Sequence, residues 1–278
     1  MQAAQQIKPI LLIGGNGKTG RRVAQKLADQ NMPFRVASRS SEARFDWNDD
    51  RTWAAALEGT SAAYITYQPD LAVPGAIDNI QAFAQAALTA NVNRLVLLSG
   101  RGEEEAQRAE RVLQQSGADW TIVRASWFAQ NFSESFLLDA ILAGHVAVPA
   151  HTATEPFVDT DDIADVVVAA LTNPAHIGKL YEVTGPRLLS FEEAVATIAS
   201  ATGRNIEYQQ LPHEQYAALA KSHGVPEDIV SLVMFLFTTV LDGRNQHVSD
   251  GIETALGRPA KDFAVYARDA SISGAWKG

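Results

Sequence analysis

The first half of the chain alternates short apolar runs with longer amphipathic stretches. Short, uninterrupted apolar runs are typical of strands that are buried on both faces of a parallel sheet. The amphipathic stretches between them are typical of helices that cover such a sheet. The pattern predicts strands at 9–13, 34–37, 62–66, 94–99 and 120–123, and helices at 18–30, 52–57, 75–91 and 103–116. This order predicts an α/β fold with a doubly wound parallel sheet of the Rossmann type.

After residue 125 the pattern is less regular and mostly helical. A capping box, Ser190-Phe191-Glu192-Glu193, predicts the start of one helix, and aspartates around Thr160 predict the start of another. We predict, in order, a short edge strand at 144–149, a helix at 160–171, a strand at 179–183, a helix at 190–201 and a strand at 205–209.

These elements predict two domains that are interleaved along the chain. Residues 1–125 and 158–185 would form the nucleotide-binding Rossmann domain, because they contain all the strands of the predicted sheet. Residues 126–157 and 186–278 would form a smaller, mostly helical lobe that binds the substrate.

The glycines that follow the first predicted strand carry the strongest functional signal. The segment reads Gly14-Gly15-Asn16-Gly17-Lys18-Thr19-Gly20 and leads directly into a predicted helix. A buried strand, a glycine turn and a helix N-terminus together form a site for a dinucleotide pyrophosphate, because free N–H groups and the helix dipole favour the negative charge. The predicted cofactor contacts are Gly14, Asn16, Gly17, Lys18, Thr19 and Gly20.

A triphosphate-binding P-loop is the main rival for the same segment. Gly17-Lys18-Thr19 matches the end of G-x-x-x-x-G-K-[ST]. That motif also requires glycine at position 12, where this chain has Leu12 inside the strand. The sequence therefore favours a dinucleotide over a nucleoside triphosphate.

The end of the second predicted strand indicates which dinucleotide is bound. A site for NAD(H) usually has an acidic residue here for the ribose 2′-OH, whereas this chain has Ser38-Arg39-Ser40. The Arg39 guanidinium suits a 2′-phosphate and the serines offer hydroxyl donors, so we expect NADP(H). Cations at 18, 21 and 22 favour the same anion, although Arg21 and Arg22 are equally well explained as solvated surface charges.

The chain lacks the usual proton-donating pair of carbonyl reductases on this scaffold. None of the six tyrosines is followed by a lysine four positions later. Where that pair would be expected, the chain has an acidic stretch, 103–110, which we interpret as a solvated helix face. Ser99, at the end of a predicted strand, is a candidate catalytic or substrate-positioning residue, with a strand-end turn residue as the alternative. The histidines show no ligand spacing, so no metal site is predicted.

Three aromatic residues follow the fifth predicted strand. Trp127, Phe128, Asn131 and Phe132 lie where ligands bind in open α/β sheets, beyond the carboxyl ends of the strands. Core packing and a substrate-pocket wall are both open interpretations of this segment.

Composition narrows the range of partners and locations. A formal net charge of −9 argues against a partner bound through nucleic-acid phosphates. The absence of cysteine excludes thiolate chemistry and is compatible with the cytoplasm, where we expect the protein. The longest apolar segment, 229–241, is too short for a membrane span, and it suits either core burial or a homodimer contact.

Several segments, in this order, resemble the NmrA-like atypical short-chain dehydrogenase/reductases, especially those akin to agroclavine and festuclavine dehydrogenases. The segments are the glycine loop, 36–40, 44–47, 97–99, 127–132, 156–159, 180–186 and 257–259. The resemblance implies a Rossmann domain with a small substrate lobe. It also implies that Asp46 lies near the adenine and Tyr67 along the cofactor, and that a missing tyrosine–lysine pair is normal in this family. This chain has Ala125-Ser126 after Arg124, where relatives commonly have proline.

Two functional hypotheses follow. The first is an NADPH-dependent reductase of a small hydrophobic or aromatic electrophile, such as an iminium, a quinone-like compound or an enone. Acceptors of this kind are already activated and make a weaker demand for a positioned acid than a simple ketone does. The second is a non-catalytic NADP(H) sensor that regulates a protein partner.

Overall fold

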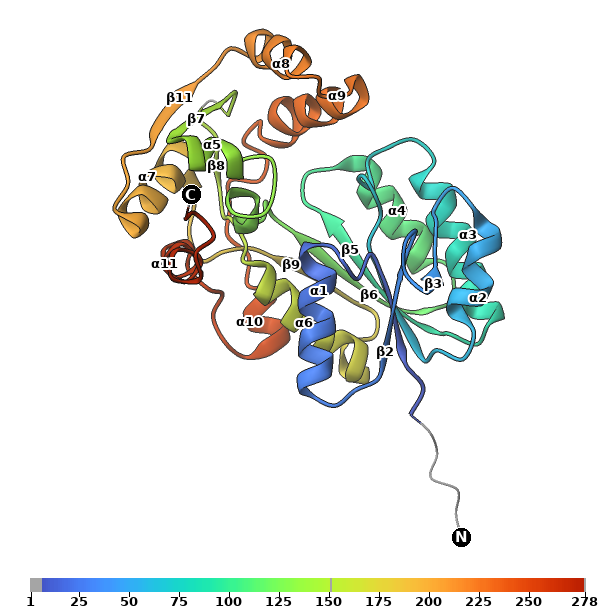
Figure 1. The fold of residues 1–278 in the computed structure, drawn as a ribbon. Helices are drawn as coiled ribbons and strands as arrows, with labels where there is room; N and C mark the ends of the chain where they lie inside the picture. Colours follow the sequence, from blue (N-terminus) through green and yellow to red (C-terminus); the bar gives the residue numbers. More distant parts are fainter. Residues whose placement is uncertain (1–6, 151, 278) are drawn as a thin grey trace. The chain divides into compact units, whose positions relative to one another are not determined.

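A computed structural model describes residues 7–150 and 152–277 (Figure 1). Contacts divide the chain into two compact units, and both are discontinuous in sequence. Unit 1 comprises Met1–Ala125, Thr160–Val183 and Gly251–Arg258. Unit 2 comprises Ser126–Asp159, Thr184–Asp250 and Pro259–Gly278.

Unit 1 is built on a seven-stranded sheet with the order β3-β2-β1-β4-β5-β6-β9. Every pairing in this sheet is parallel. The strands are β1 (Ile10–Ile13), β2 (Phe34–Ser38), β3 (Ala43–Arg44), β4 (Ala62–Ile65), β5 (Arg94–Gly100), β6 (Asp119–Ala125) and β9 (Lys179–Val183). From β1 the chain adds β2 and β3 on one side and then returns to add β4 on the other side of β1. The topological switch point, where open α/β sheets bind ligands, therefore lies between β1 and β4.

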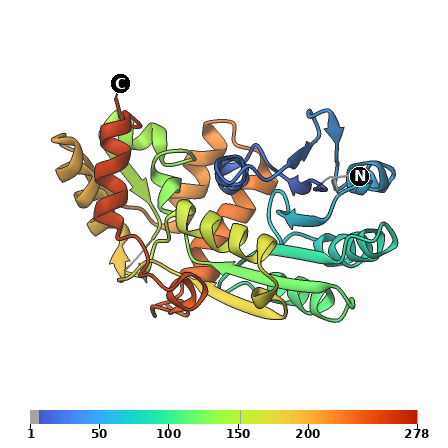
Figure 2. The same cartoon turned by 90° about the horizontal axis from the view of Figure 1, so that it is seen from below.

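Helices cover both faces of this sheet (Figures 1 and 2). On one face α1 (Lys18–Asp29) packs against α6 (Thr160–Thr172), and α10 (Gly251–Leu256) packs against α6 and β9. On the other face lie α2 (Trp53–Leu57), α3 (Ala76–Thr89) and α4 (Glu104–Gln114). Short 3-10 turns, η1 (Asp50–Thr52) and η3 (Pro174–His176), complete the unit. The observed fold confirms the predicted doubly wound Rossmann architecture.

An aromatic cluster anchors the α2–α3 face of unit 1. Phe45 contacts Trp47 edge-to-face at 4.9 Å between ring centroids, and Trp53 and Phe83 pack around the same pair. All four side chains are buried. This cluster fixes the segment after β3, which leads past the carboxyl end of β2.

Unit 2 is mostly helical and contains two small sheets. Its elements are η2 (Ala129–Phe132), α5 (Leu138–Ala143), β7 (His145–Val148), β8 (Thr154–Glu155), β10 (Leu189–Ser190), α7 (Phe191–Thr202), β11 (Glu207–Gln210), α8 (His213–Ser222), α9 (Glu227–Phe235), a π-helix η4 (Leu236–Val240) and α11 (Phe263–Ser273). Strand β7 pairs in parallel with β11, and β10 pairs antiparallel with β8. The predicted capping box at Ser190 and Glu193 is present and opens α7.

The apolar segment 229–241 does not form one regular α-helix. It comprises most of α9 and then widens into the π-helix η4. Phe237 of η4 is buried in the core of unit 2, whereas Leu232 and Met234 of α9 are only partly buried. The segment therefore combines core burial with a partly exposed apolar face.

Candidate cofactor and substrate site

The glycine loop after β1 requires glycine at two positions, one for its backbone conformation and one for close packing. Gly14 has φ +70°, in the left-handed region. A Cβ on Gly20 would lie 2.3 Å from the Gly14 carbonyl oxygen and 2.7 Å from the Gly15 Cα. These contacts are with backbone, which cannot move aside, so the loop and α1 can approach each other only without side chains. The loop thus provides the close backbone cradle that a pyrophosphate requires.

Helix α1 presents a suitable N-terminus to this cradle. Gly17 is its N-cap, and its first turn contains no acidic residue that would repel an anion. Asn16 is exposed and Lys18 is half-buried, whereas the Thr19 side chain is buried and accepts a hydrogen bond from the Tyr64 hydroxyl at 2.9 Å. Thr19 therefore offers an anion its backbone N–H rather than its hydroxyl.

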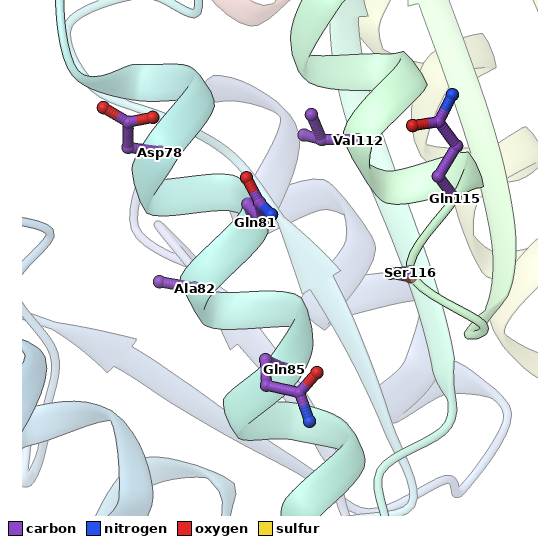
Figure 3. A pocket seen from close by; sticks show the side chains of 7 residues that line it. All are labelled: Asp78, Gln81, Ala82, Gln85, Val112, Gln115 and Ser116. Atoms are coloured by element: carbon purple, nitrogen blue, oxygen red, sulfur yellow. The ribbon is translucent and has the colours of Figure 1, made fainter.

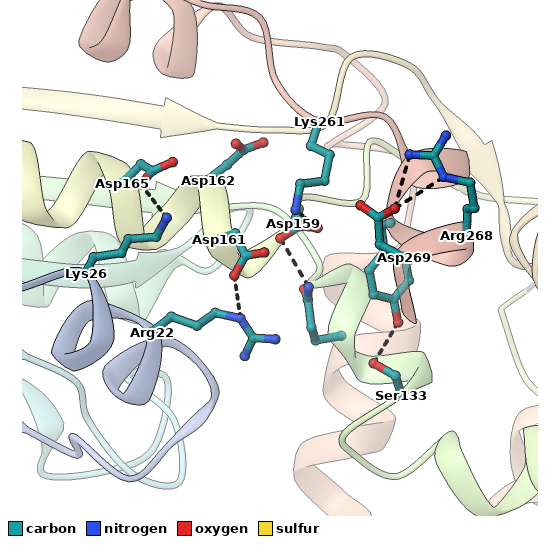
Figure 4. A network of polar contacts seen from close by, with 12 residues as sticks. Arg22, Lys26, Ser133, Asp159, Asp161, Asp162, Asp165, Lys261, Arg268 and Asp269 are labelled. Carbon is teal, nitrogen blue, oxygen red and sulfur yellow. Dashed lines mark hydrogen bonds and ion pairs between the residues drawn. The ribbon is translucent and has the colours of Figure 1, made fainter. Parts of the chain in front are cut away.

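The cations further along α1 have protein partners. Arg22 Nε donates to Asp161 Oδ1 at 2.8 Å, and Lys26 Nζ lies 2.5 Å from Asp165 Oδ1 (Figure 4). The charge of Arg22 is therefore compensated by α6. This pairing favours a structural role for Arg22 over contact with a cofactor phosphate.

The end of β2 forms a compact serine turn that leaves Arg39 open. The Ser38 hydroxyl accepts hydrogen bonds from the Ser40 and Ser41 backbone N–H groups, at 3.3 and 3.1 Å. Arg39 is exposed, and its guanidinium makes no hydrogen bond or ion pair with any residue that the structure describes. The turn presents an unoccupied guanidinium beside the Ser40 hydroxyl, a donor set that fits a 2′-phosphate.

Asp46 precedes Trp47 in the chain, and Tyr67 packs on the Trp47 ring. The Asp46 carbonyl accepts from Trp53 Nε1 at 2.8 Å, which fixes the backbone of this half-buried residue. Tyr67, just after β4, packs its ring on Trp47 at 4.8 Å and accepts from Asn79 Nδ2 at 2.8 Å. Both residues therefore have rigid positions, next to the carboxyl ends of β3 and β4 respectively.

Ser99 belongs to a buried polar network at the end of β5. Its hydroxyl donates to Glu110 Oε1 at 2.6 Å, and Arg124 Nε donates to the same oxygen at 2.9 Å. Arg124 also donates to Glu110 Oε2, which makes the pair bidentate. The Ser99 hydroxyl thus holds a carboxylate in place.

The interpretation of the acidic stretch 103–110 as a solvated helix face is wrong for two of its glutamates. Glu110 is 2% exposed and Glu103 is 6% exposed, whereas Glu104 is exposed. Glu110 is buried because Arg124 and Ser99 compensate its charge. Glu103 is the N-cap of α4 but makes no capping hydrogen bond, because its carboxyl turns back over Gly100.

Glu103, unlike the buried Glu110, has no cation partner among the described residues. Arg101, itself buried, pairs with Glu182 of β9, and Arg124 pairs with Glu110. Glu103 instead forms a side-chain hydrogen bond with Asp70, in the loop after β4. Burial and the carboxyls of Asp70, Glu105 and Glu110 raise the pKa of Glu103 to about 9. Sequence inspection missed this pair, because Asp70 and Glu103 belong to different strand ends.

The aromatic segment of unit 2 divides into a core part and a partly exposed part. Phe132 is fully buried, with Phe157 and Phe263 edge-to-face at 5.4 and 5.5 Å. Trp127, Phe128 and Asn131 are half-buried, and the Asn131 amide has no hydrogen-bond partner among residues 7–150 and 152–277. Only these three residues present surface that a ligand could contact without a rearrangement of the core.

A separate groove runs along the outer surface of α3 and α4 (Figure 3). Its walls are mainly polar: Asp78, Gln81, Ala82, Gln85, Val112, Gln115 and Ser116. It lies on the helices rather than at the strand ends, so it does not form part of the cofactor site. In the described part of the chain there is no cluster of three metal-ligating side chains, and no helix combines the length and the apolar character of a membrane span.

The parallel sheet, its switch point and the glycine cradle at the N-terminus of α1 define a nucleotide-binding Rossmann protein. Residues 14–174 match the sequence model of a family described as NAD(P)H-binding. The chain belongs to this family. The match confirms the cofactor class predicted from the glycine loop.

Characterised relatives align along nearly the whole chain. Agroclavine dehydrogenase of Claviceps fusiformis is 30% identical over 94% of this chain and 96% of its own length. NAD(P)H azoreductase of Xenophilus azovorans is 29% identical over 93% of this chain and 96% of its own. These relatives confirm the resemblance to clavine dehydrogenases and support the expected NAD(P)H-dependent oxidoreductase.

Solved structures share the fold. The NADPH-dependent quinone oxidoreductase QOR2 of Escherichia coli, complexed with NADPH, superposes with a TM-score of 0.77 at 19% identity, over 94% of this chain and 99% of that one. NmrA, a negative transcriptional regulator in complex with NAD, superposes with a TM-score of 0.70 at 15% identity, over 97% of both chains.

Proposed function

We propose that this protein is an NADPH-dependent reductase that transfers hydride to a small hydrophobic or aromatic electrophile, such as an iminium, a quinone-like compound or an enone. The observation that carries the proposal is a dinucleotide-binding glycine cradle in a chain that has no tyrosine–lysine pair. Where that pair would be expected, α4 carries the buried Glu110, which is already bound to Arg124 and Ser99. An activated acceptor suits such a site better than a simple ketone does.

Each residue has a distinct role in this proposal. The loop from Gly14 to Gly20 would hold the pyrophosphate, and Ser38, Arg39 and Ser40 would hold the 2′-phosphate. Asp46 and Tyr67 would border the adenine and the length of the cofactor. When bound, NADPH supplies the hydride. Ser99 would act as a positioning residue, since its hydroxyl orients Glu110 and Arg124 at the end of β5.

The substrate pocket would be formed by the partly exposed aromatic segment. Trp127 and Phe128 would stack on a flat acceptor, and the Asn131 amide would bind a polar atom. Phe132 would support them from the core. Enclosure by aromatic groups would exclude water and fix the orientation of the acceptor, which contributes to the rate through positioning.

The test is turnover by the purified protein with NADPH. We expect NADPH oxidation with at least one member of a panel that contains a cyclic iminium, a naphthoquinone, an enone and a cationic triphenylmethane dye. A matched Gly20→Ala variant, which fills the cradle, should show none of this turnover. If the wild-type protein reduces no acceptor in the panel, the proposed activity is wrong.

The pocket has its own test in two aromatic variants. Trp127→Leu should raise the KM for an aromatic acceptor roughly 10- to 100-fold while it leaves NADPH affinity unchanged, since it removes a stacking surface. Phe132→Ala should instead lower the free energy of unfolding by ~3–5 kcal/mol, because it leaves a cavity in the core. Steady-state kinetics and urea unfolding measure both effects. A purely structural effect of Trp127→Leu would argue against the pocket.

A non-catalytic NADP(H) sensor is the second candidate, favoured by the likeness of the fold to NmrA. A sensor would bind the dinucleotide, transfer no hydride and retain a protein partner only in one redox state of the cofactor. Calorimetric binding without turnover, together with NADP(H)-dependent retention of a partner, would support it.

We further propose a cytoplasmic protein that forms a homodimer through the apolar face of α9. Leu232 and Met234 leave part of their apolar surface uncovered there, whereas Val233 packs on the core of unit 2. Light scattering of the wild-type protein and of Leu232→Glu tests the homodimer, and a monomeric wild-type protein would contradict it.

A further inference from the structure

The carboxyl of Glu103, just after β5, has no evident structural role in the described part of the chain. It makes no capping bond to α4 and no ion pair. Its Oε2 atom is buried without a hydrogen-bond donor among the described residues. An ionised carboxylate oxygen that is buried without a donor is costly, and a proton on the carboxyl lowers this cost because it removes the charge.

The surroundings of Glu103 hold that proton in place. Its partner Asp70 lies in the loop after β4, so the two carboxyls join neighbouring strand ends. The groups that face Glu103 are the carboxyls of Asp70, Glu105 and Glu110, and each of them disfavours a second negative charge. Burial and these neighbours therefore favour the neutral form of Glu103, hydrogen-bonded to Asp70.

The position of this pair matches the reactive end of the cofactor site. The half of a Rossmann sheet that starts at the glycine loop holds one mononucleotide, and the half built on β4, β5 and β6 holds the other. The serine turn with Arg39 lies at the end of β2, which assigns the adenosine to that half. The nicotinamide half is then the one in which Asp70 and Glu103 lie.

We propose that Glu103, hydrogen-bonded to Asp70, is the general acid of the site and protonates acceptors that take up a proton as well as a hydride. This inference rests on the proposed reductase activity. For an enone, the hydride forms a C–H bond with the β-carbon, and the enolate that results takes the Glu103 proton. Glu103 is left as a carboxylate and regains a proton from solvent, so that one hydride and one proton are consumed in each turnover.

The proposal extends the substrate class beyond acceptors that are cations already. A triphenylmethane cation or an iminium is neutralised by the hydride alone and needs no acid. Enones and quinones gain a negative charge from the hydride and need one. Glu103 would therefore allow the protein to reduce enones and quinones as well as cationic acceptors.

Two acceptors and two glutamine variants separate this role from a structural one. With an enone or a quinone, Glu103→Gln should reduce kcat ~10²–10⁴-fold, the usual contribution of a general acid. With the triphenylmethane dye, its kcat should stay near the wild-type value. Glu104→Gln, on the exposed side of the same helix turn, should change neither rate. Equal losses of rate with both kinds of acceptor would show that Glu103 is only structural.

The pH profile adds a second readout. With the proton-requiring acceptor, kcat of the wild-type protein should fall as Glu103 ionises near pH 9, and this limb should be absent with the dye. A wild-type protein that reduces only cationic acceptors, or a profile that is identical for both kinds, would overturn the proposal.

Infrared spectroscopy tests the acid independently of turnover. The wild-type protein at pH 7 should show a protonated carboxyl band that Glu103→Gln lacks, and NADPH binding should shift this band. If the band is missing or NADPH leaves it unchanged, Glu103 is not the acid. If the band behaves as expected but no acceptor is reduced, the proposed reductase activity fails and the placement of the acid stands.

Discussion

At the scale of single residues, we propose that Arg39 decides which dinucleotide the protein prefers. Its exposed guanidinium has no protein partner in the described ranges, so a bound 2′-phosphate would be its first ion pair. Arg39→Ala should weaken NADPH binding roughly 10- to 100-fold, because a charge-assisted hydrogen bond is lost, and should leave NADH binding unchanged. Calorimetric titration with both cofactors measures the difference.

The control for this prediction is Arg111→Ala, since Arg111 is an exposed arginine on α4. It has the same effect on net charge and should leave both affinities unchanged. Should the wild-type protein bind NADH at least as tightly as NADPH, the assignment of Arg39 to the 2′-phosphate would be wrong.

The residues of the candidate site were predictable from sequence only where the interacting residues are close together in the chain. The glycine loop follows directly from the order of strand, turn and helix. The burial of Glu110 depends on Arg124, fourteen positions away, and Glu103 meets Asp70, which belongs to a different loop. A charged residue on an amphipathic helix looks solvent-exposed until its distant partner is known.

At the scale of elements, the junction of β1 and α1 tolerates no added atom at Gly20. Gly20→Ala places a Cβ against the Gly14 carbonyl oxygen, so the helix must move away from the strand. We expect a loss of about 1–3 kcal/mol in unfolding free energy and the loss of measurable NADPH binding. Thermal unfolding with and without NADPH measures both.

Gly17→Ala is the matched control, because its Cβ would lie 3.2 Å from the same oxygen, and Gly17 has an ordinary φ of −76°. It should cost less stability and retain part of the cofactor affinity. If the two variants behave alike, close packing of α1 on the loop is not what the glycines provide.

Long, regular elements were predictable, whereas short ones were not. All five strands expected in the first half are present, since each is a mainly apolar run of at least four residues. The strands β3, β8 and β10 have two residues each, too few to show a period. The change from α9 to the π-helix η4 is also invisible in the apolar pattern, because both helix types bury leucine and phenylalanine alike.

At the scale of the whole molecule, Glu103 makes stability depend on pH. In an unfolded chain its carboxyl ionises near its ordinary pKa of 4.5, whereas in the fold the pKa is raised to about 9. Between these values the folded state keeps a proton that the unfolded state has lost. The contribution of Glu103 to stability is therefore complete below pH 4.5 and is lost as the pH rises toward 9, by at most about 1.4 kcal/mol per pH unit.

Urea unfolding at several pH values tests this linkage. Compared with the wild-type protein, Glu103→Gln should gain stability steadily from pH 5 to pH 9. Glu104→Gln should show no such trend, since Glu104 is exposed. A constant difference between Glu103→Gln and the wild-type protein across this range would mean that the buried carboxyl is ionised throughout.

The segment Gly251–Arg258 completes unit 1 from a distant part of the chain. Gly251 packs so closely that a Cβ would lie 2.1 Å from the Glu182 carbonyl oxygen, and Arg258 binds Asp162 and Asp165 of α6 at 2.7 and 2.5 Å. During synthesis all seven strands leave the ribosome long before this segment does. The surface of β9 and α6 that α10 covers in the folded protein therefore stays exposed on the nascent chain until most of unit 2 has been translated. We expect a gene fragment that stops after β9 to encode the whole sheet and yet to yield a protein that aggregates, because the α10-binding surface stays uncovered.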